Sequence, residues 1–217
     1  MDNKISLKKY LLTVALGFGL GGFLWGVVMY RGIPDIEYTF HYSFAIALSI
    51  FGGIALQWFS KSVKKMAGSI LVVFLALVIG FIVTVVSGYV LYLYGGLFLV
   101  PLGYLINISI LKEFLNLSPS ISIGSFWAFF LVIGFVTGFS YSFFFKLKKW
   151  SLTWRGGVGF ALGSLIAPVI GNSFGFLLDC QLVSYLLTFS IMSAIFGVFL
   201  GWGVYTTRSD IRSRDLS

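Results

Sequence analysis

The chain has 217 residues, of which 59% are hydrophobic and only 10% charged, and its formal net charge is +8. Soluble domains are about 25% charged, so this chain lacks the polar residues needed to cover a surface that faces water. Long apolar runs without strand-like alternation recur along its whole length. They predict an all-α, polytopic transmembrane helix bundle and exclude a soluble globular class.

Six apolar segments have the length of about 20 residues that a membrane crossing requires. We expect them at roughly 10–30, 43–60, 68–89, 123–145, 156–178 and 183–206. The first segment follows three lysines, as the apolar part of a signal peptide would, but no small-residue cleavage site accompanies it. It is therefore predicted to remain as the first helix.

One further apolar stretch, 90–111, is ambiguous. Gly95, Gly96 and Pro101 interrupt it, and non-helical backbone at membrane depth must be buried in protein or reached by water. A re-entrant hairpin or an interfacial segment fits this pattern. An overlong third helix that tilts and ends near Tyr94 fits as well, and a seventh span is the remaining alternative.

Lysine and arginine decide between six and seven spans. They form five groups: Lys4/Lys8/Lys9, Lys61/Lys64/Lys65, Lys146/Lys148/Lys149, Arg155 and Arg208/Arg212/Arg214. With six spans, 13 of the 15 basic residues share one side, and only Arg31 and Lys112 lie opposite. Basic residues in short loops mark the cytoplasmic side. We therefore predict a multi-pass protein of the cell (plasma or inner) membrane with six spans and both termini in the cytoplasm.

The same bias explains the net charge, because the basic residues flank apolar spans. The expected partner is consequently the lipid bilayer and not nucleic acid. A membrane-protein partner or a second copy of the chain is also compatible with the sequence.

An internal repeat supports six spans. The second helix of each pair begins with a serine, followed nine positions later by a small residue: Ser43 and Gly52, Ser125 and Gly134, Ser184 and Ser193. The starts of the first and fifth spans also match, at 7–13 and 147–153. We expect a single transmembrane domain over 1–217, built as three parallel hairpins at about 1–62, 63–147 and 148–210.

The chain contains 26 glycines, which are concentrated inside the predicted spans. Pairs four residues apart place two missing side chains on one helix face. In lipid such faces let helix backbones approach closely, within one chain or against a partner. The predicted helix-packing positions are Gly17, Gly21, Gly134, Gly138, Gly159, Gly163, Gly171, Gly175, Gly197 and Gly201.

No ionisable residue lies inside the six predicted spans, which argues against proton relays, voltage sensing and most intramembrane enzymes. Glu37 and His41 are four positions apart in the first outer loop, and Asp179 lies in the last one. Two ligands do not make a metal site, and a solvated loop explains the same residues. The lone Cys180 excludes an internal disulfide. We expect no catalytic residue, metal or cofactor.

Asn172 is the strongest intramembrane candidate for binding a solute. Pro168 and Gly171 precede it and could open the helix so that backbone groups face a substrate. An interhelical hydrogen bond with a packing kink explains the same residues. The aromatic residues near span ends, including Trp25, are expected in the headgroup layer, and so is Gln57.

The second helix, Phe51-Gly-Gly-Ile-Ala-Leu-Gln57-Trp58-Phe-Ser-Lys61, resembles a unit of uncharacterised glycine-rich multi-pass bacterial membrane proteins, whose helices end in Leu-Gln-Trp and a basic residue. That resemblance covers the first hairpin and implies no function. In architecture, a bundle of six spans with both termini in the cytoplasm is similar to the substrate-capturing subunits of energy-coupling-factor transporters. None of the binding residues of those subunits is matched here.

Two function classes follow from the sequence. The first is a transport-related protein, a permease or a substrate-capturing subunit, for a small neutral or apolar solute. The second is a non-catalytic scaffold or assembly subunit that packs through its glycine seams. A cavity lined by Asn172 would favour transport, whereas a filled interior would favour assembly.

Overall fold

The computed structural model describes residues 5–31, 36–94 and 123–214, with side-chain detail over 5–31, 43–83, 130–148 and 150–208. Within this part of the chain all regular structure is helical, in agreement with the all-α prediction. The helices are α1 (Leu7–Arg31), α2 (Ile36–Gln57), the short 3-10 helix η1 (Trp58–Ser60), α3 (Val63–Tyr94), α6 (Ile123–Phe144), α7 (Lys149–Leu177) and α8 (Gln181–Arg214).

Five of these helices are long and apolar enough to cross a membrane, so the chain is a multi-pass membrane protein. The apolar segments are Leu7–Arg31, Ser43–Ser60, Val63–Val83, Trp150–Leu177 and Gln181–Arg208. In α6 the apolar stretch with described side chains is shorter, Phe130–Phe144. Each of the six expected spans coincides with one described helix.

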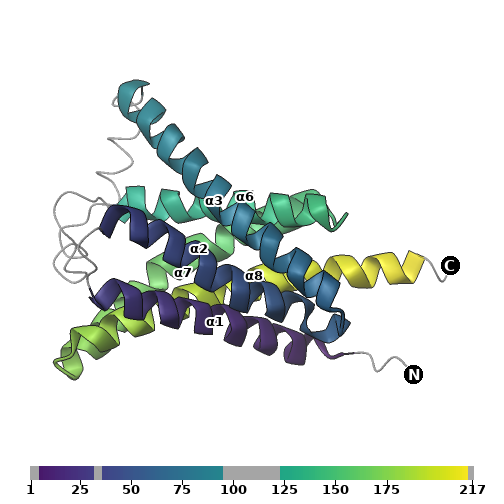
Figure 1. Cartoon of the computed structure of the whole chain (residues 1–217), viewed down its shortest axis with the longest axis horizontal. Helices are drawn as coiled ribbons and strands as arrows, with labels where there is room; N and C mark the ends of the chain where they lie inside the picture. The colour runs from purple at the N-terminus through teal and green to yellow at the C-terminus, as the bar shows by residue number, and fades with distance from the viewer. Residues whose placement is uncertain (1–4, 32–35, 95–122, 215–217) are drawn as a thin grey trace.

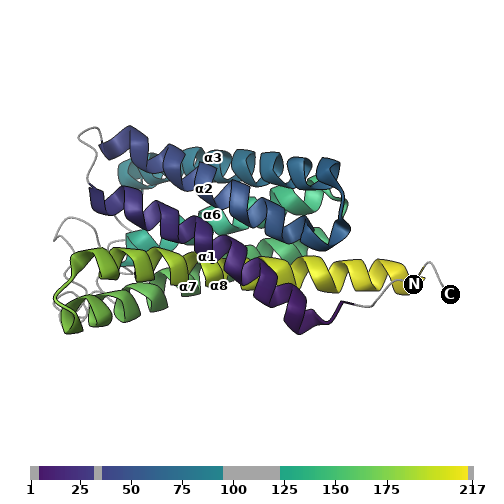
Figure 2. The same ribbon diagram turned by 60° about the horizontal axis from the view of Figure 1, so that its bottom comes forward.

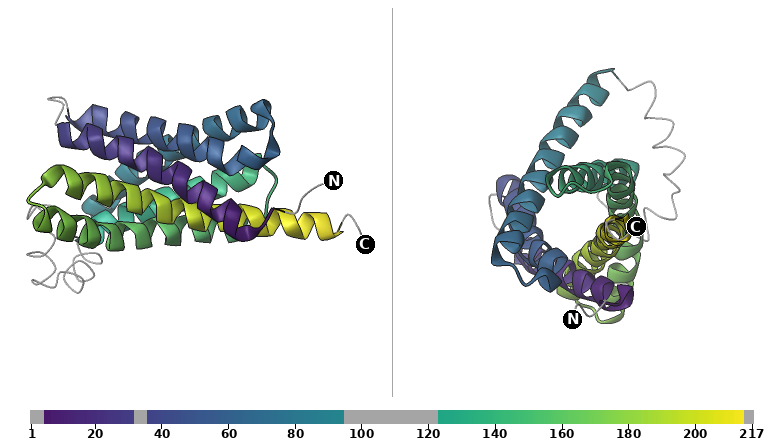
Figure 3. Two further views of the ribbon diagram at one scale, coloured as in Figure 1. Left: turned by 90° about the horizontal axis from the view of Figure 1, so that it is seen from below. Right: turned by 90° about the vertical axis from the view of Figure 1, so that its right-hand side faces the viewer.

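The six long helices form a closed ring in sequence order. Each packs on the next along the chain, and α8 returns to pack on α1. Their axes run roughly along the long dimension of the molecule (Figures 1 and 2). The view along that dimension shows the ring directly (Figure 3, right). Only a few contacts cross the ring from α2 to α8.

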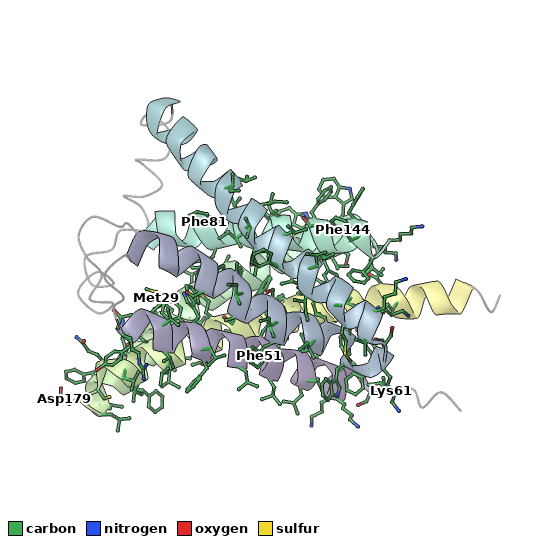
Figure 4. All side chains as sticks on the ribbon, viewed as in Figure 1. Met29, Phe51, Lys61, Phe81, Phe144 and Asp179 are labelled. Atoms are coloured by element: carbon green, nitrogen blue, oxygen red, sulfur yellow. The ribbon has the colours of Figure 1, made fainter. Side chains whose placement is uncertain are left out.

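Successive helices run in opposite directions, so the start of α1, the α2–α3 and α6–α7 turns and the end of α8 share one end of the bundle (Figure 1). We call this the basic end. Lys61 lies there, whereas Asp179 lies at the opposite end (Figure 4). Lys61, Lys146 and Asp179 each adopt a left-handed backbone, with φ of 50°, 51° and 47°, where the chain turns between helices.

Helix α3 is longer than a membrane crossing needs. It spans 32 residues, or about 48 Å at 1.5 Å per residue, and its last turns lean away from the ring (Figure 1). This matches the alternative of an overlong third helix that ends near Tyr94. The rest of the ambiguous segment, 95–111, lies outside the described residues.

Aromatic rings fill the middle of the ring. Phe44, Phe130, Phe160 and Phe196 come from four helices, and each is at most 5% exposed. The Phe160 ring stacks on Phe196 with 4.4 Å between centroids and lies 4.8 Å from Phe130. Trp25 packs against Phe44 at 4.4 Å. We call these five residues the aromatic layer; such pairs add about 0.5–1.5 kcal/mol each beyond their burial.

The position of Trp25 corrects one expectation from the sequence. Its side chain is 0% exposed and belongs to the aromatic layer, so it is not an anchor in the headgroup layer. Trp58, Trp150 and Trp154, by contrast, are 55%, 79% and 58% exposed. Burial of Trp25 follows from Gly22 and Gly26 on the same helix, which let α8 approach closely.

The predicted glycine positions lie at contacts between neighbouring helices of this chain. A Cβ atom on Gly21 would lie 2.8 Å from the Ala47 carbonyl oxygen of α2, and one on Gly163 would lie 2.7 Å from that of Met192 in α8. The other eight glycines likewise meet atoms of an adjacent helix. Close backbone approach therefore holds the ring together. Gly68 differs, because a Cβ atom added there would have no neighbouring atom within 4 Å.

Candidate functional site

A buried polar cluster lies at the basic end of the ring. The Gln57 side-chain amide donates a hydrogen bond to the Tyr141 hydroxyl across 2.8 Å. The Ser69 hydroxyl lies 3.2 Å from the same oxygen and shares a second hydrogen bond with it. These three side chains are 1%, 0% and 0% exposed. They come from the end of α2, the start of α3 and the end of α6. We call them the axial polar cluster.

Tyr10 extends this site from α1. Its hydroxyl donates to the Leu56 carbonyl oxygen across 3.1 Å, next to Gln57. The Tyr10 ring packs against Phe59 and Tyr205, with centroids 6.1 and 5.6 Å apart. The Tyr141 ring stacks on Phe145 at 4.5 Å. Aromatic rings therefore cover the cluster towards the basic end, as the aromatic layer does towards the middle of the membrane.

Among the described residues, one positive charge acts on the cluster. The Arg208 guanidinium, half-buried on α8, interacts electrostatically with the hydroxyls of both Tyr10 and Tyr141. Asp179 is the sole carboxylate among the described side chains, and it lies at the far end of the molecule. The described groups of the cluster itself are neutral hydroxyls and an amide.

Within the described part of the chain, the Gln57 carbonyl oxygen, Oε1, has no hydrogen-bond partner although it is fully buried. A buried acceptor without a partner costs about 1–3 kcal/mol, and polar groups at membrane depth are expensive to keep. The arrangement leaves one strong acceptor beside two hydroxyls that both donate and accept. This chemistry suits a small neutral molecule that carries an N–H or O–H group.

The sequence-predicted residues Pro168, Gly171 and Asn172 lie elsewhere, on α7 near the opposite end. Helix α7 runs through Pro168 without a break, so the helix is not opened there. Asn172 is half-buried and its Oδ1 accepts a hydrogen bond from the Ser184 hydroxyl of α8 across 2.6 Å. Gly171 packs on Ser184 and Thr188. A solute-binding role for these residues stays a prediction.

The other outer-face candidates cannot be placed at the level of side chains. Glu37 and His41 belong to the first turns of α2, where side chains are outside the described part, and Lys112 and Glu113 fall outside it entirely. Among the described residues no three potential ligands come close enough to hold a metal.

The sequence did not single out the axial polar cluster. The sequence predicts Gln57 at the interface, but its side chain is buried and bonds Tyr141 of α6. Tyr141 itself gave no signal beyond its place between Ser140 and Ser142 near the end of a span. Its partners are 84 and 72 positions away, and only the closed ring brings them together.

Two shallow surface hollows lie at the basic end and away from the cluster. One, of about 480 Å³, is bordered by α1 and α8 and is lined by Leu7, Lys8, Leu11, Leu12, Ala15 and Val198. The other, of about 570 Å³, surrounds the α6–α7 turn at Ser142–Leu147. Both are wide open and mainly apolar, as expected of surfaces that face lipid tails.

No protein-family model, curated protein or solved structure matches the chain.

Proposed function

We propose that the chain has six membrane spans, arranged as three hairpins, with both termini in the cytoplasm of a cell whose plasma membrane holds it. The support is the collection of described basic residues at one end of the ring, among them Lys64, Lys148 and Arg208. The bias of basic residues toward the cytoplasmic side orients that end inward.

The contacts of two glycines that align in the repeat support the hairpin arrangement. Gly138 in α6 packs on Leu152 of α7, and Gly197 in α8 packs on Phe18 of α1. In the three-hairpin scheme, each of these two contacts joins the second helix of one hairpin to the first helix of the next hairpin. A ring that closes from the third hairpin to the first is what three parallel repeats around an axis would form.

Within this arrangement we propose a transport-related function for a small neutral solute. The observation that carries the proposal is the buried Gln57 carbonyl oxygen, which has no partner among the described residues and lies beside the hydroxyls of Tyr141 and Ser69. The proposed binding site is thus the axial polar cluster, and a solute-binding role for Asn172 stays a prediction. No catalytic step is part of the proposal.

The aromatic layer then acts as the barrier between this site and the outer half of the membrane. In the described state its rings close the axis, so passage requires them to rotate or their helices to separate. Hydrophobic constrictions of this kind gate membrane proteins by excluding water. The site and the layer together make an inward-located binding site with a closed path to the outside.

The test measures solute flux in proteoliposomes. Urea and glycerol are the probes, because both are small, neutral and able to donate to Gln57. We expect the wild-type protein to speed their equilibration relative to empty vesicles, and Gln57→Leu to reduce that gain by roughly tenfold through loss of the acceptor. Ser49→Ala is the control: Ser49 is buried on the same helix but bonds its own backbone at Ile46. Equal flux in Gln57→Leu and Ser49→Ala would contradict the proposal.

The filled aromatic layer also favours the second candidate, a scaffold subunit. In that case the axial polar cluster only ties α2, α3 and α6 together. Because the predicted glycines are occupied by contacts within the chain, a partner would bind another apolar face, for example that of Gly68 on α3. Stable co-purification with a partner, without any solute flux, would support this alternative.

A further inference from the structure

We propose that Arg155, Trp202 and Thr206 form a binding site for the phosphate of an anionic phospholipid. Arg155 lies on α7, six residues after the helix begins at Lys149, or about 9 Å along it. The other two residues lie on α8, which packs directly on α7. The site therefore lies on the rim of the ring, apart from the axial polar cluster.

Three contacts with α8 fix the Arg155 side chain. Its guanidinium lies over the Trp202 ring, 4.2 Å from the centroid. Nη1 donates a hydrogen bond to the Thr206 hydroxyl across 2.6 Å. Its stem runs beside Gly203, where a Cβ atom would lie 3.4 Å from Arg155 Cδ. A long side chain held in this way loses little additional entropy when it binds a ligand.

The fixed guanidinium still has donors to offer. Arginine carries five N–H groups, and within the described part of the chain only the one to Thr206 has an acceptor. The Trp202 ring covers the face of the guanidinium and leaves its edge open. That edge matches two phosphate oxygens, which arginine binds in a forked geometry that lysine cannot reproduce.

The surroundings indicate a lipid phosphate as the occupant. Trp150, Trp154 and Trp202 are 79%, 58% and 41% exposed, and exposed tryptophan marks the level of the lipid headgroups. The described side chains at this end include no carboxylate that could neutralise Arg155; Asp179 lies at the other end (Figure 4). A half-buried cation beside exposed tryptophans and apolar surface is complementary to a lipid with a net negative charge.

The experiment is native mass spectrometry of the full chain in micelles that contain equal amounts of phosphatidylglycerol and phosphatidylcholine. We expect the wild-type chain to retain phosphatidylglycerol preferentially, and Arg155→Gln to weaken that retention roughly tenfold. Arg155→Lys, which keeps the charge but loses the fork, should fall between them. Lys64→Gln removes an exposed charge at the same end and serves as the control, with unchanged retention.

Several results would overturn the site. They are equal retention of the two lipids by the wild-type chain, equal behaviour of Arg155→Gln and Lys64→Gln, or displacement of the bound lipid by inorganic phosphate, which would point to a free anion. If Arg155→Gln does not fold, Thr206→Val keeps Arg155 and its charge and removes the acceptor of the Nη1 bond, together with the bonds of the Thr206 hydroxyl to the Trp202 and Gly203 carbonyl oxygens within α8. It should weaken retention by a few-fold, and full retention in this variant would count against the proposal.

Discussion

The side-chain amide of Gln57 at the end of α2 donates its hydrogen bond to the Tyr141 hydroxyl near the end of α6. Both residues are fully buried, and the second hydroxyl partner, Ser69, comes from the helix between them. One neutral oxygen thus joins three helices. The position of this contact explains both why the site is uncharged and why it is closed in the described state.

Replacement of Tyr141 by phenylalanine tests how strongly the cluster is coupled. We expect Tyr141→Phe to lower the free energy of unfolding by about 1–3 kcal/mol, because the amide of Gln57 loses its acceptor while it remains buried. Gln57→Leu should cost a comparable amount alone and little more in the Tyr141→Phe background. The measurement is unfolding of the purified protein in mixed micelles. Strictly additive losses would show that the two side chains do not interact.

Glycine substitutions test the close helix approach. Gly163→Ala should destabilise the chain by about 1–3 kcal/mol, since the added methyl group would lie 2.7 Å from the Met192 carbonyl oxygen of α8 and the helices must separate. Gly68→Ala is the matched control. Among the described residues, no atom of another helix lies within 4 Å of a Cβ atom added there, and alanine favours a helix by roughly 0.5–1 kcal/mol over glycine. The midpoint temperature of thermal unfolding in detergent should therefore fall for Gly163→Ala and rise for Gly68→Ala. A similar shift in both variants would contradict the packing.

The positions of the helices follow well from the sequence. Long apolar runs without charges are forced into helices because lipid offers no other hydrogen-bond partners. The expected segment 156–178 still began too late, since α7 starts at Lys149. The pattern of basic residues predicts Arg155 as a flanking charge, but the long stem of arginine lets its charged head reach the interface from inside the helix.

The axial polar cluster could not be predicted in the same way. A hydropathy pattern describes each helix by itself, whereas the cluster depends on which helices face one another. Gln57 and Trp25 illustrate this limit, one as a polar residue and the other as an aromatic residue. The sequence predicts both residues in the headgroup layer, yet both are buried between helices that close glycine contacts bring together.

The natural cysteine provides a test of the six-span arrangement. Cys180 lies next to Asp179, at the end opposite the basic residues, so a maleimide that cannot cross membranes should label it from outside intact cells. Trp150→Cys in a Cys180→Ser background should react only after permeabilisation. Trp150 is the suitable site because its side chain is 79% exposed. The seven-span alternative predicts the reverse for both positions.

The most direct test of the proposed function is the water accessibility of Ser69, which lies within the axial polar cluster. A Ser69→Cys variant in the Cys180→Ser background is exposed to a small charged methanethiosulfonate reagent from either side of the membrane. A transport function predicts that the thiol reacts from the cytoplasmic side, and more slowly from the outside as the aromatic layer opens. A thiol that reacts from neither side until the protein is unfolded would contradict transport through this site.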